Sequence, residues 1–325
     1  MRITSNLPLR AMALAALSIP LLAFAQTYPT RPVRLVVPFA AGGGTDLLAR
    51  TVGQKVGEVW KQSVVIDNRA GAGGNLGADV VAKSTPDGYT LLVNITGLAI
   101  SASLYKSLPF DVVKDFTPIV HISSSALVLV ANNGMPSTVK ELVALAKSQP
   151  GKINYGSTGL GAPPHLAGEL LGSMAGVSLV HIPYKGDAPM IPALIANEIQ
   201  IGFIPQSAAL PHVRSGKLRA IAVAAARRAS NLPDVPTVIE SGIPNFDLTG
   251  WTGVFGPAGL SRDVVAQIHD AFAKVLADRE FVEKMRGMGF DAAPPGTPDE
   301  FAARVKADVG VYAKIVRDAK VPLID

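Results

Sequence analysis

The sequence LVVPFAAGGGTDLLAR, residues 35–50, joins an apolar run to a helical pattern through three consecutive glycines. Val33–Val37 has the composition of a buried strand, and Thr45–Trp60 has the periodicity of an amphipathic helix. Glycine costs backbone entropy on folding, and a single glycine would serve a tight turn. We therefore expect that a ligand approaches the bare backbone here, with a tight turn without a ligand as the alternative.

This glycine loop has the features of an anion site. A strand-to-helix turn presents free N–H groups at the positive end of the helix, where an anion can bind without a cationic side chain. Thr45 adds a hydroxyl, and Asp46 falls in the first helical turn, where an acid is favourable. Asp46 could equally be a simple helix cap. The candidate binding residues are Gly42, Gly43, Gly44, Thr45 and Asp46, and Gly43→Val is expected to abolish binding.

A second glycine-rich loop, in NYGSTGLGAPPHLAGELL, precedes another helix. Pro163 and Pro164 follow the loop, and proline suits the first turn of a helix. Two such helix starts facing one cleft would clamp an anion with N–H groups and hydroxyls. A histidine at this helix start could join the site, although a lone histidine is more often structural. The candidates are Gly156, Ser157, Thr158, Gly159 and His165.

Further candidates follow two later strands. Tyr184 in HIPYKGDAP could form a pocket wall, whereas Lys185 is favoured as a surface lysine over a partner for a carboxylate. Gln206 and Ser207 follow the strand IQIGFI and could donate hydrogen bonds to a ligand. Trp251 is expected in the core or between lobes.

Strands and helices alternate through most of the chain, which is typical of an α/β fold with a largely parallel sheet. The late helices, Ser261–Leu276 and Thr297–Lys320, have few strands of their own, so we expect them to pack on the N-terminal unit. We predict two lobes with a hinge at crossings near 123–126 and 224–250. Residues 26–125 with 227–325 would form the first lobe, and residues 126–226 the second.

The first 25 residues have the pattern of a secretory signal peptide. Arg2 and Arg10 make a basic start, Ala11–Leu22 is apolar, and Ala23-Phe24-Ala25 resembles a cleavage site. The apolar run is shorter than the about 20 residues of a spanning helix, although an uncleaved membrane anchor is the alternative. We expect cleavage after Ala25 and export of a protein that is not embedded in the membrane.

The composition and the missing motifs of the chain exclude several classes of protein function. Without Arg2 and Arg10 the formal charge falls from +5 to +3 (5 − 2), and the basic residues are scattered, so no nucleic-acid surface is indicated. The absence of cysteine excludes disulfides and thiolate chemistry. The chain lacks G-x-S-x-G, H-E-x-x-H, G-x-G-x-x-G and P-loop motifs. Its histidines, at 121, 165, 181, 212 and 269, have no metal-ligand spacing. These observations favour a binding protein without cofactor or metal over an enzyme.

Several long motifs, in order, resemble the Bug family, the extracytoplasmic solute receptors of tripartite tricarboxylate transporters. They are YPTRPVRLVVPFAAGGGTDLLAR, VVIDNRAGAGGNLGADVVAKSTPDGYTLL, INYGSTGLGAPPHLAGELL, VHIPYKG and LPDVPTVIESG. The resemblance covers nearly the whole chain after the signal. It implies a type II periplasmic-binding-protein fold, in which two lobes close on a small organic carboxylate and deliver it to membrane transport subunits.

The resemblance also adds site residues. The first-lobe loop that holds the carboxylate matches Phe39 to Asp46, which adds Phe39 and Ala41, and the loop Asn94 to Gly97 adds Thr96. Relatives often carry an acid after the strand that reads IQIGFI here, where this chain has Pro205-Gln206-Ser207. That departure favours a carboxylate without an amine. A ligand sensor for a membrane kinase and an exported hydrolase are the alternative functions, and we expect a monomer.

Overall fold

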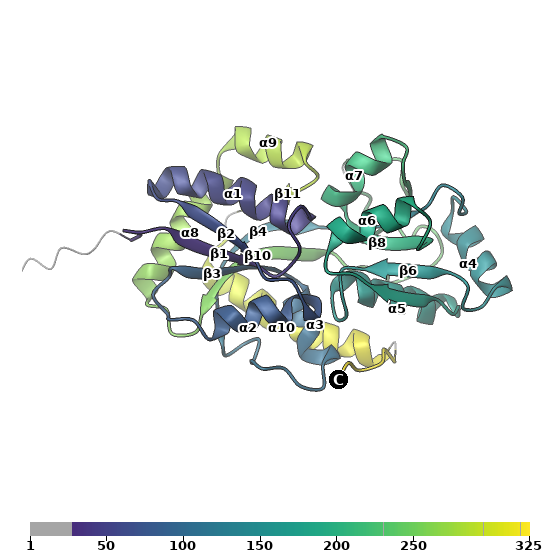
Figure 1. Cartoon of the computed structure of the whole chain (residues 1–325), viewed down its shortest axis with the longest axis horizontal. Helices are drawn as coiled ribbons and strands as arrows, with labels where there is room; N and C mark the ends of the chain where they lie inside the picture. The colour runs from purple at the N-terminus through teal and green to yellow at the C-terminus, as the bar shows by residue number, and fades with distance from the viewer. Residues whose placement is uncertain (1–27, 230, 295, 319) are drawn as a thin grey trace, which may run out of the picture.

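The structure, a computed structural model, describes residues 28–229, 231–294, 296–318 and 320–325, so the predicted signal peptide lies outside the described residues. The described strands form two sheets, each flanked by helices (Figure 1). We call the six-stranded sheet with its helices lobe 1 and the five-stranded sheet with its helices lobe 2. The predicted two-lobed α/β fold is confirmed. Among the residues that the structure describes, none of the helices combines the length and apolarity needed to cross a membrane.

Lobe 1, on the left in Figure 1, has the strand order β11-β4-β10-β3-β1-β2. Its strands are β1 (Val33–Val37), β2 (Val64–Asn68), β3 (Thr90–Ile95), β4 (Phe116–Ser125), β10 (Gly250–Pro257) and β11 (Asp291–Ala292). Its helices are α1 (Gly44–Trp60), the 3-10 turn η1 (Ala72–Gly74), α2 (Asn75–Ala82), α3 (Gly97–Leu104), α8 (Arg262–Leu276), α9 (Arg279–Gly287) and α10 (Pro298–Asp318).

Lobe 2, on the right in Figure 1, has the strand order β7-β6-β8-β5-β9. Its strands are β5 (Leu127–Ala131), β6 (Asn154–Ser157), β7 (Val180–Pro183), β8 (Ile201–Pro205) and β9 (Arg219–Ala224). Its helices are α4 (Val139–Ser148), α5 (Pro163–Ala175), α6 (Asp187–Ile195) and α7 (Gln206–Arg214).

The prediction of largely parallel sheets is wrong, because both sheets are mixed. β1 pairs in parallel with β2 and β3, and β6 pairs in parallel with β7 and β8. β10 runs antiparallel to β3 and β4, and β5 runs antiparallel to β8 and β9. The reason is the double crossing: β4 leads the chain out of lobe 1 and its neighbour β10 begins the return, so the two run in opposite directions.

The late helices pack on lobe 1, as predicted. Phe272 of α8 shares a core with Leu48 of α1, and Phe301 of α10 shares a core with Trp251 of β10. The sequence analysis missed α9, which begins after Asp278, whose carboxylate accepts hydrogen bonds from the N–H groups of the next turn. This acidic cap was the available signal.

The connection from β9 to β10 packs largely on lobe 2. Val223 N–H donates to Pro236 O at 2.8 Å, Val238 N–H donates to Val223 O at 2.9 Å, and Leu248 N–H donates to Ala224 O at 3.1 Å. The predicted lobe limits assign this connection to the first lobe. We propose instead that lobe 2 extends to about residue 249, because these bonds continue its sheet edge beyond β9.

Candidate ligand-binding site

The carboxyl ends of strands from both lobes meet around a pocket at the junction. β1, β3, β6, β7 and β8 end there, and each is followed by a helix, namely α1, α3, α5, α6 and α7. Ligands of open α/β sheets bind at this edge, outside the carboxyl ends of the strands. The pocket has an empty volume of ≈ 620 Å³, which includes open solvent at its mouth.

The pocket wall is mostly apolar, with a few polar groups at helix starts. The apolar lining residues are Phe39, Leu48, Ile95, Leu127, Pro163, Pro164, Pro205, Leu248, Trp251 and Phe290. The remaining lining residues are Gly44, Thr45, Thr96, Thr158, Asp187, Ser207, Gly250 and Thr252. Gly44, Asp187 and Ser207 lie in the first turns of their helices, whose N–H groups and dipoles favour a negative charge.

The glycine loop before α1 is held in shape by Asp46. The Asp46 carboxylate accepts hydrogen bonds from Gly42 N–H at 2.8 Å, from Arg50 at 2.9 Å and from Asn68 at 3.0 Å. Asn68 also donates to Phe39 O at 3.0 Å. Burial alone would raise the pKa of Asp46, but these hydrogen bonds outweigh burial and hold its pKa below the ordinary value. Asp46 therefore positions the loop, and its side chain is not among those that line the pocket.

Of the three glycines, Gly44 is the one at the pocket. A methyl group added at Gly44 would lie 2.9 Å from Ser207 Oγ and 3.6 Å from Asp187 Oδ2, both on the opposite lobe. A methyl group at Gly43 would make only ordinary contacts of 3.5 Å or more. Gly44 therefore lies where lobe 2 approaches closely, and a branched side chain there would meet lobe 2. The expected effect of Gly43→Val on binding stays a prediction.

Contacts between the lobes surround the pocket. Ala40 N–H donates to Lys185 O at 3.1 Å, and Gly44 N–H donates to Asp187 Oδ2 at 3.3 Å. At the other rim, Tyr105 of lobe 1 donates its hydroxyl to Leu160 O of lobe 2 at 2.7 Å. The structure therefore represents a closed arrangement of the two lobes.

The predicted site residues fall into three groups. Phe39, Gly44, Thr45, Thr96 and Thr158 line the pocket. Gly159 and Tyr184 line an adjoining groove with Gly71–Gly74, and this groove shares Phe39 and Thr158 with the pocket. The remaining candidates line neither: Ala41, Gly42, Gly43, Asp46, Gly156, Ser157, His165 and Gln206. Gln206 borders a separate surface hollow beside Ala225–Ala229, and Lys185 is exposed, as expected.

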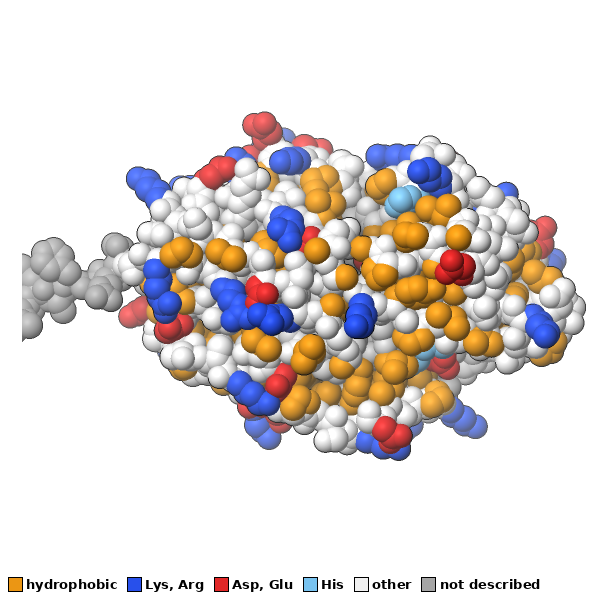
Figure 2. All heavy atoms as spheres, viewed as in Figure 1, with side chains coloured by type: hydrophobic (Ala, Val, Ile, Leu, Met, Phe, Trp, Pro, Cys, Tyr) orange, Lys and Arg blue, Asp and Glu red, His pale blue; other side chains and the backbone are white. Residues whose placement is uncertain are grey.

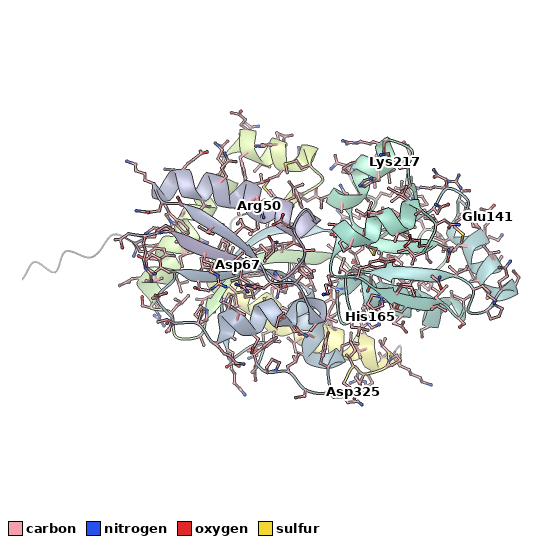
Figure 3. All side chains as sticks on the ribbon, in the orientation of Figure 1. Arg50, Asp67, Glu141, His165, Lys217 and Asp325 are labelled. Atoms are coloured by element: carbon pink, nitrogen blue, oxygen red, sulfur yellow. The ribbon has the colours of Figure 1, made fainter. Side chains whose placement is uncertain are left out.

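His165 and Ser157 belong to a polar cluster inside lobe 2. His165 lies at the start of α5 next to the lobe junction (Figure 3), accepts a hydrogen bond from Gly161 N–H at 3.2 Å and stacks on His181 with ring centroids 4.3 Å apart. Ser157 Oγ lies 2.6 Å from His181 Nε2. Burial, with a smaller effect of His165, lowers the pKa of His181 to about 3. This serine–histidine pair is a poor catalytic dyad, because Ser157 is fully buried and His181 is a weak base.

The sequence analysis missed Asp187 as a site residue. It is 5% exposed, and it is the one ionisable side chain among the described residues that line the pocket. Asp187 Oδ1, Ser207 Oγ and Thr158 Oγ1 are buried without a hydrogen-bond partner in the described part of the chain. The sequence analysis considered an acid only at Pro205-Gln206-Ser207, whereas the structure has an acid from α6 in the pocket wall. A first-turn acid after a strand was the available signal.

Trp251 lies in both of its expected settings. It is buried against Phe255 and Phe301, lines the pocket, and donates its indole N–H to Asp308 at 2.7 Å. Thr96 tethers the same strand, because its hydroxyl accepts from Trp251 N–H at 2.7 Å. One wall of the pocket is thus fixed by β10.

The two-lobed fold and the pocket between the lobes define a solute-binding protein of the periplasmic-binding-protein type. The family model TctC, the tripartite tricarboxylate transporter family receptor, matches residues 48–309. The chain belongs to this family. Protein BugT of Bordetella pertussis is 35% identical over 298 residues, which cover 90% of this chain and 91% of BugT. The resemblance to the Bug family is confirmed.

Several solved structures are similar to this chain in fold and sequence. R. palustris Rpa4515 with adipate has a TM-score of 0.88 and 33% identity, covering 91% of this chain and 100% of that chain. MatC from Rhodopseudomonas palustris with bound malate has a TM-score of 0.86 and 30% identity, covering 89% of this chain and 100% of that chain. The periplasmic binding protein BugD has a TM-score of 0.88 and 34% identity, covering 91% of this chain and 100% of BugD.

Proposed function

We propose that the mature protein is a periplasmic receptor that captures a small organic carboxylate between its lobes and delivers it to membrane transport subunits. The observation that carries the proposal is the convergence of helix N-termini on a pocket whose described lining contains no lysine or arginine. Helix N–H groups are suited to a carboxylate in such a setting. The membership of the receptor family, and the adipate and malate in its relatives, support this ligand class.

The proposed ligand residues come from both lobes. Thr45 offers a hydroxyl from lobe 1, and Thr158 and Ser207 offer hydroxyls from lobe 2. Phe39 and Trp251 would pack on the carbon skeleton. A longer ligand could extend past Phe39 and Thr158 into the groove at Tyr184, because the two hollows share these residues.

The proposed mechanism is binding by closure, without covalent chemistry. A ligand that contacts both lobes stabilises the closed form over an open one and so shifts the population toward closure. The two crossings, β4 to β5 and β9 to β10, would serve as the hinge. We propose that the protein has no catalytic activity and acts as a monomer, with the signal peptide removed after Ala25. Mass spectrometry of the exported protein tests the cleavage site, and light scattering tests the monomer.

A thermal-shift screen of the refolded mature protein tests the function. The panel contains mono-, di- and tricarboxylates, aromatic acids, amino acids and, as controls, neutral sugars. A ligand that binds only the folded state stabilises it by about 2.7 kcal/mol at a hundredfold excess over its Kd. We expect a clear rise in Tm with carboxylates and none with sugars. A flat response to every carboxylate would contradict the proposal.

A further inference from the structure

We propose that Asp187 is a counter-ion for a cationic nitrogen on the ligand, so that the solute is an amino carboxylate rather than a plain carboxylic acid. This inference rests on the proposed function, because it refines the ligand class of the same pocket. It also differs from the expectation of a ligand without an amine, which rested on the absence of an acid directly after the strand IQIGFI.

The first argument is the unpartnered oxygen of Asp187. Its Oδ2 accepts one long hydrogen bond, from Gly44 N–H at 3.3 Å, and its Oδ1 is buried with no partner among the described residues. A carboxylate in this state is costly, since buried charges are normally paired or fully hydrogen-bonded. A ligand ammonium would supply both the missing charge and the missing donor.

The second argument is the lack of a protein cation at the same place. No lysine or arginine is found among the described lining residues, and Asp46, the other buried aspartate of the junction, already has Arg50. Burial raises the pKa of Asp187 to about 6, offset in part by the Gly44 hydrogen bond. The carboxyl is thus still mainly ionised at pH 7.5, where an ammonium group is its natural partner.

The third argument separates a ligand role from a helix-capping role. An acid in the first turn of α6 is favourable in itself, but the cap position is Gly186 and no side-chain capping bond forms there. The carboxylate instead reaches across the junction to α1, beside Ser207 and Pro205. Its position therefore lies between the two lobes, where a bound solute would touch it.

The geometry assigns complementary parts of the ligand to different groups. The ligand carboxylate would bind the helix N-termini and the hydroxyls of Thr45 and Thr158, and its ammonium would donate to Asp187 Oδ1 and Ser207 Oγ.

Isothermal titration at pH 7.5 with matched ligand pairs tests the inference. The pairs differ by one amine on the same skeleton: succinate and aspartate, glutarate and glutamate, propionate and alanine, butyrate and 4-aminobutyrate. We expect at least one amino member to bind tenfold or more tightly than its plain partner. The isosteric variant Asp187→Asn should lose that preference, with the Kd of the amino ligand rising tenfold to a hundredfold. Asp79→Asn, which changes an aspartate of α2 outside the pocket lining, should retain it.

The outcomes distinguish the inference from the proposed function. If plain carboxylates bind the wild type as tightly as their amino partners, the receptor function stands and the counter-ion role is overturned. If Asp187→Asn binds plain and amino ligands with the wild-type ratio, the role is overturned as well. If no member of any pair binds, the counter-ion role is overturned, and the wider thermal-shift panel decides the receptor function. Should Asp187→Asn not fold, the wild-type ratios alone decide.

Discussion

The backbone N–H of Gly44 in lobe 1 donates a hydrogen bond to the carboxylate of Asp187 in lobe 2, at 3.3 Å across the ligand pocket. The first turn of α1 is thus in contact with an acid of α6, and the two lobes are joined at the place where a ligand carboxylate would also find N–H donors. The burial of the Asp187 charge and the space beside Gly44 therefore both depend on whether the lobes are closed.

The ligand-free protein should close more readily in acid than at neutral pH. Burial raises the pKa of Asp187 to about 6, against about 3.9 for a hydrated aspartate. The closed form therefore binds the proton more tightly than an open form. Protonation of Asp187 therefore favours closure. This contribution is fully present below about pH 4 and is lost as the pH rises through about 6. The full effect is about 3 kcal/mol.

Small-angle scattering at pH 5 and pH 8 measures this effect as a change in the radius of gyration. The wild type should be more compact at pH 5, and Asp187→Asn should have the same radius at both values. A variant that keeps the wild-type pH dependence would show that another group is responsible.

Gly44→Val should weaken ligand binding through a collision between the lobes. A Cβ at Gly44 lies 2.9 Å from Ser207 Oγ, so a branched side chain would hold the lobes apart. Overpacking of this kind costs about 1–3 kcal/mol, which corresponds to about a 5- to 150-fold rise in Kd measured by titration. Gly43→Ala is the matched control, because its Cβ would make only ordinary contacts. Equal affinities of the two variants would contradict the close approach at Gly44.

Tyr105→Phe should weaken binding modestly without loosening either lobe. The lost hydroxyl joins lobe 1 to Leu160 O of lobe 2, and one such hydrogen bond contributes about 0.5–1.5 kcal/mol. A two- to tenfold rise in Kd is therefore expected, mainly from faster ligand dissociation in stopped-flow measurements. Tyr89→Phe removes a hydroxyl that bonds Thr30 within lobe 1 and should leave the off-rate unchanged. A larger effect for Tyr89→Phe than for Tyr105→Phe would refute the closure role.

His181 should make the fold sensitive to acid. Its pKa is lowered to about 3 by burial, with His165 contributing, against about 6.5 in the unfolded chain. Its contribution to stability is present above about pH 6.5 and is lost as the pH falls toward 3. Urea unfolding at pH 4.5, 5.5 and 6.5 gives the slope of stability with pH. His181→Phe, which keeps an aromatic ring beside Tyr155 and His165, should reduce that slope by about 1.4 kcal/mol per pH unit. An unchanged slope would assign the acid sensitivity to other groups.

Charged side chains of both signs are mixed on the visible face of the molecule. Figure 2 shows basic and acidic groups interspersed on this face, without a continuous basic stripe, and apolar side chains gathered on lobe 2 beside the junction. The small net charge left after removal of Arg2 and Arg10 is spread in the same way. Electrostatic attraction of an anionic solute would therefore come chiefly from the helix starts at the pocket.

Local sequence determined the elements that carry the site. The apolar run Val33–Val37, the glycines before α1 and the helical pattern of Thr297–Lys320 are short-range patterns, and the structure has the predicted strand, helix start and helix there. The motif order also determined the family, because long runs of residues are shared with it. These features depend on neighbours in the chain, whose preferences can be read without knowing the fold.

Tertiary structure decided which of those residues face the pocket. The Asp46 carboxylate turns to Gly42, Arg50 and Asn68, and the Ser157 hydroxyl turns into lobe 2, although Asp46 follows a strand that ends at the site and Ser157 is the last residue of another. Asp187 became a pocket residue only because α6 meets α1, and its partner Gly44 is 143 positions away in the chain. The direction of each side chain depends on the packing of both lobes, and the antiparallel pairing of β4 with β10 depends on the double crossing of the chain. Such long-range contacts leave no periodic pattern in a single sequence, so only the folded arrangement of the lobes reveals them.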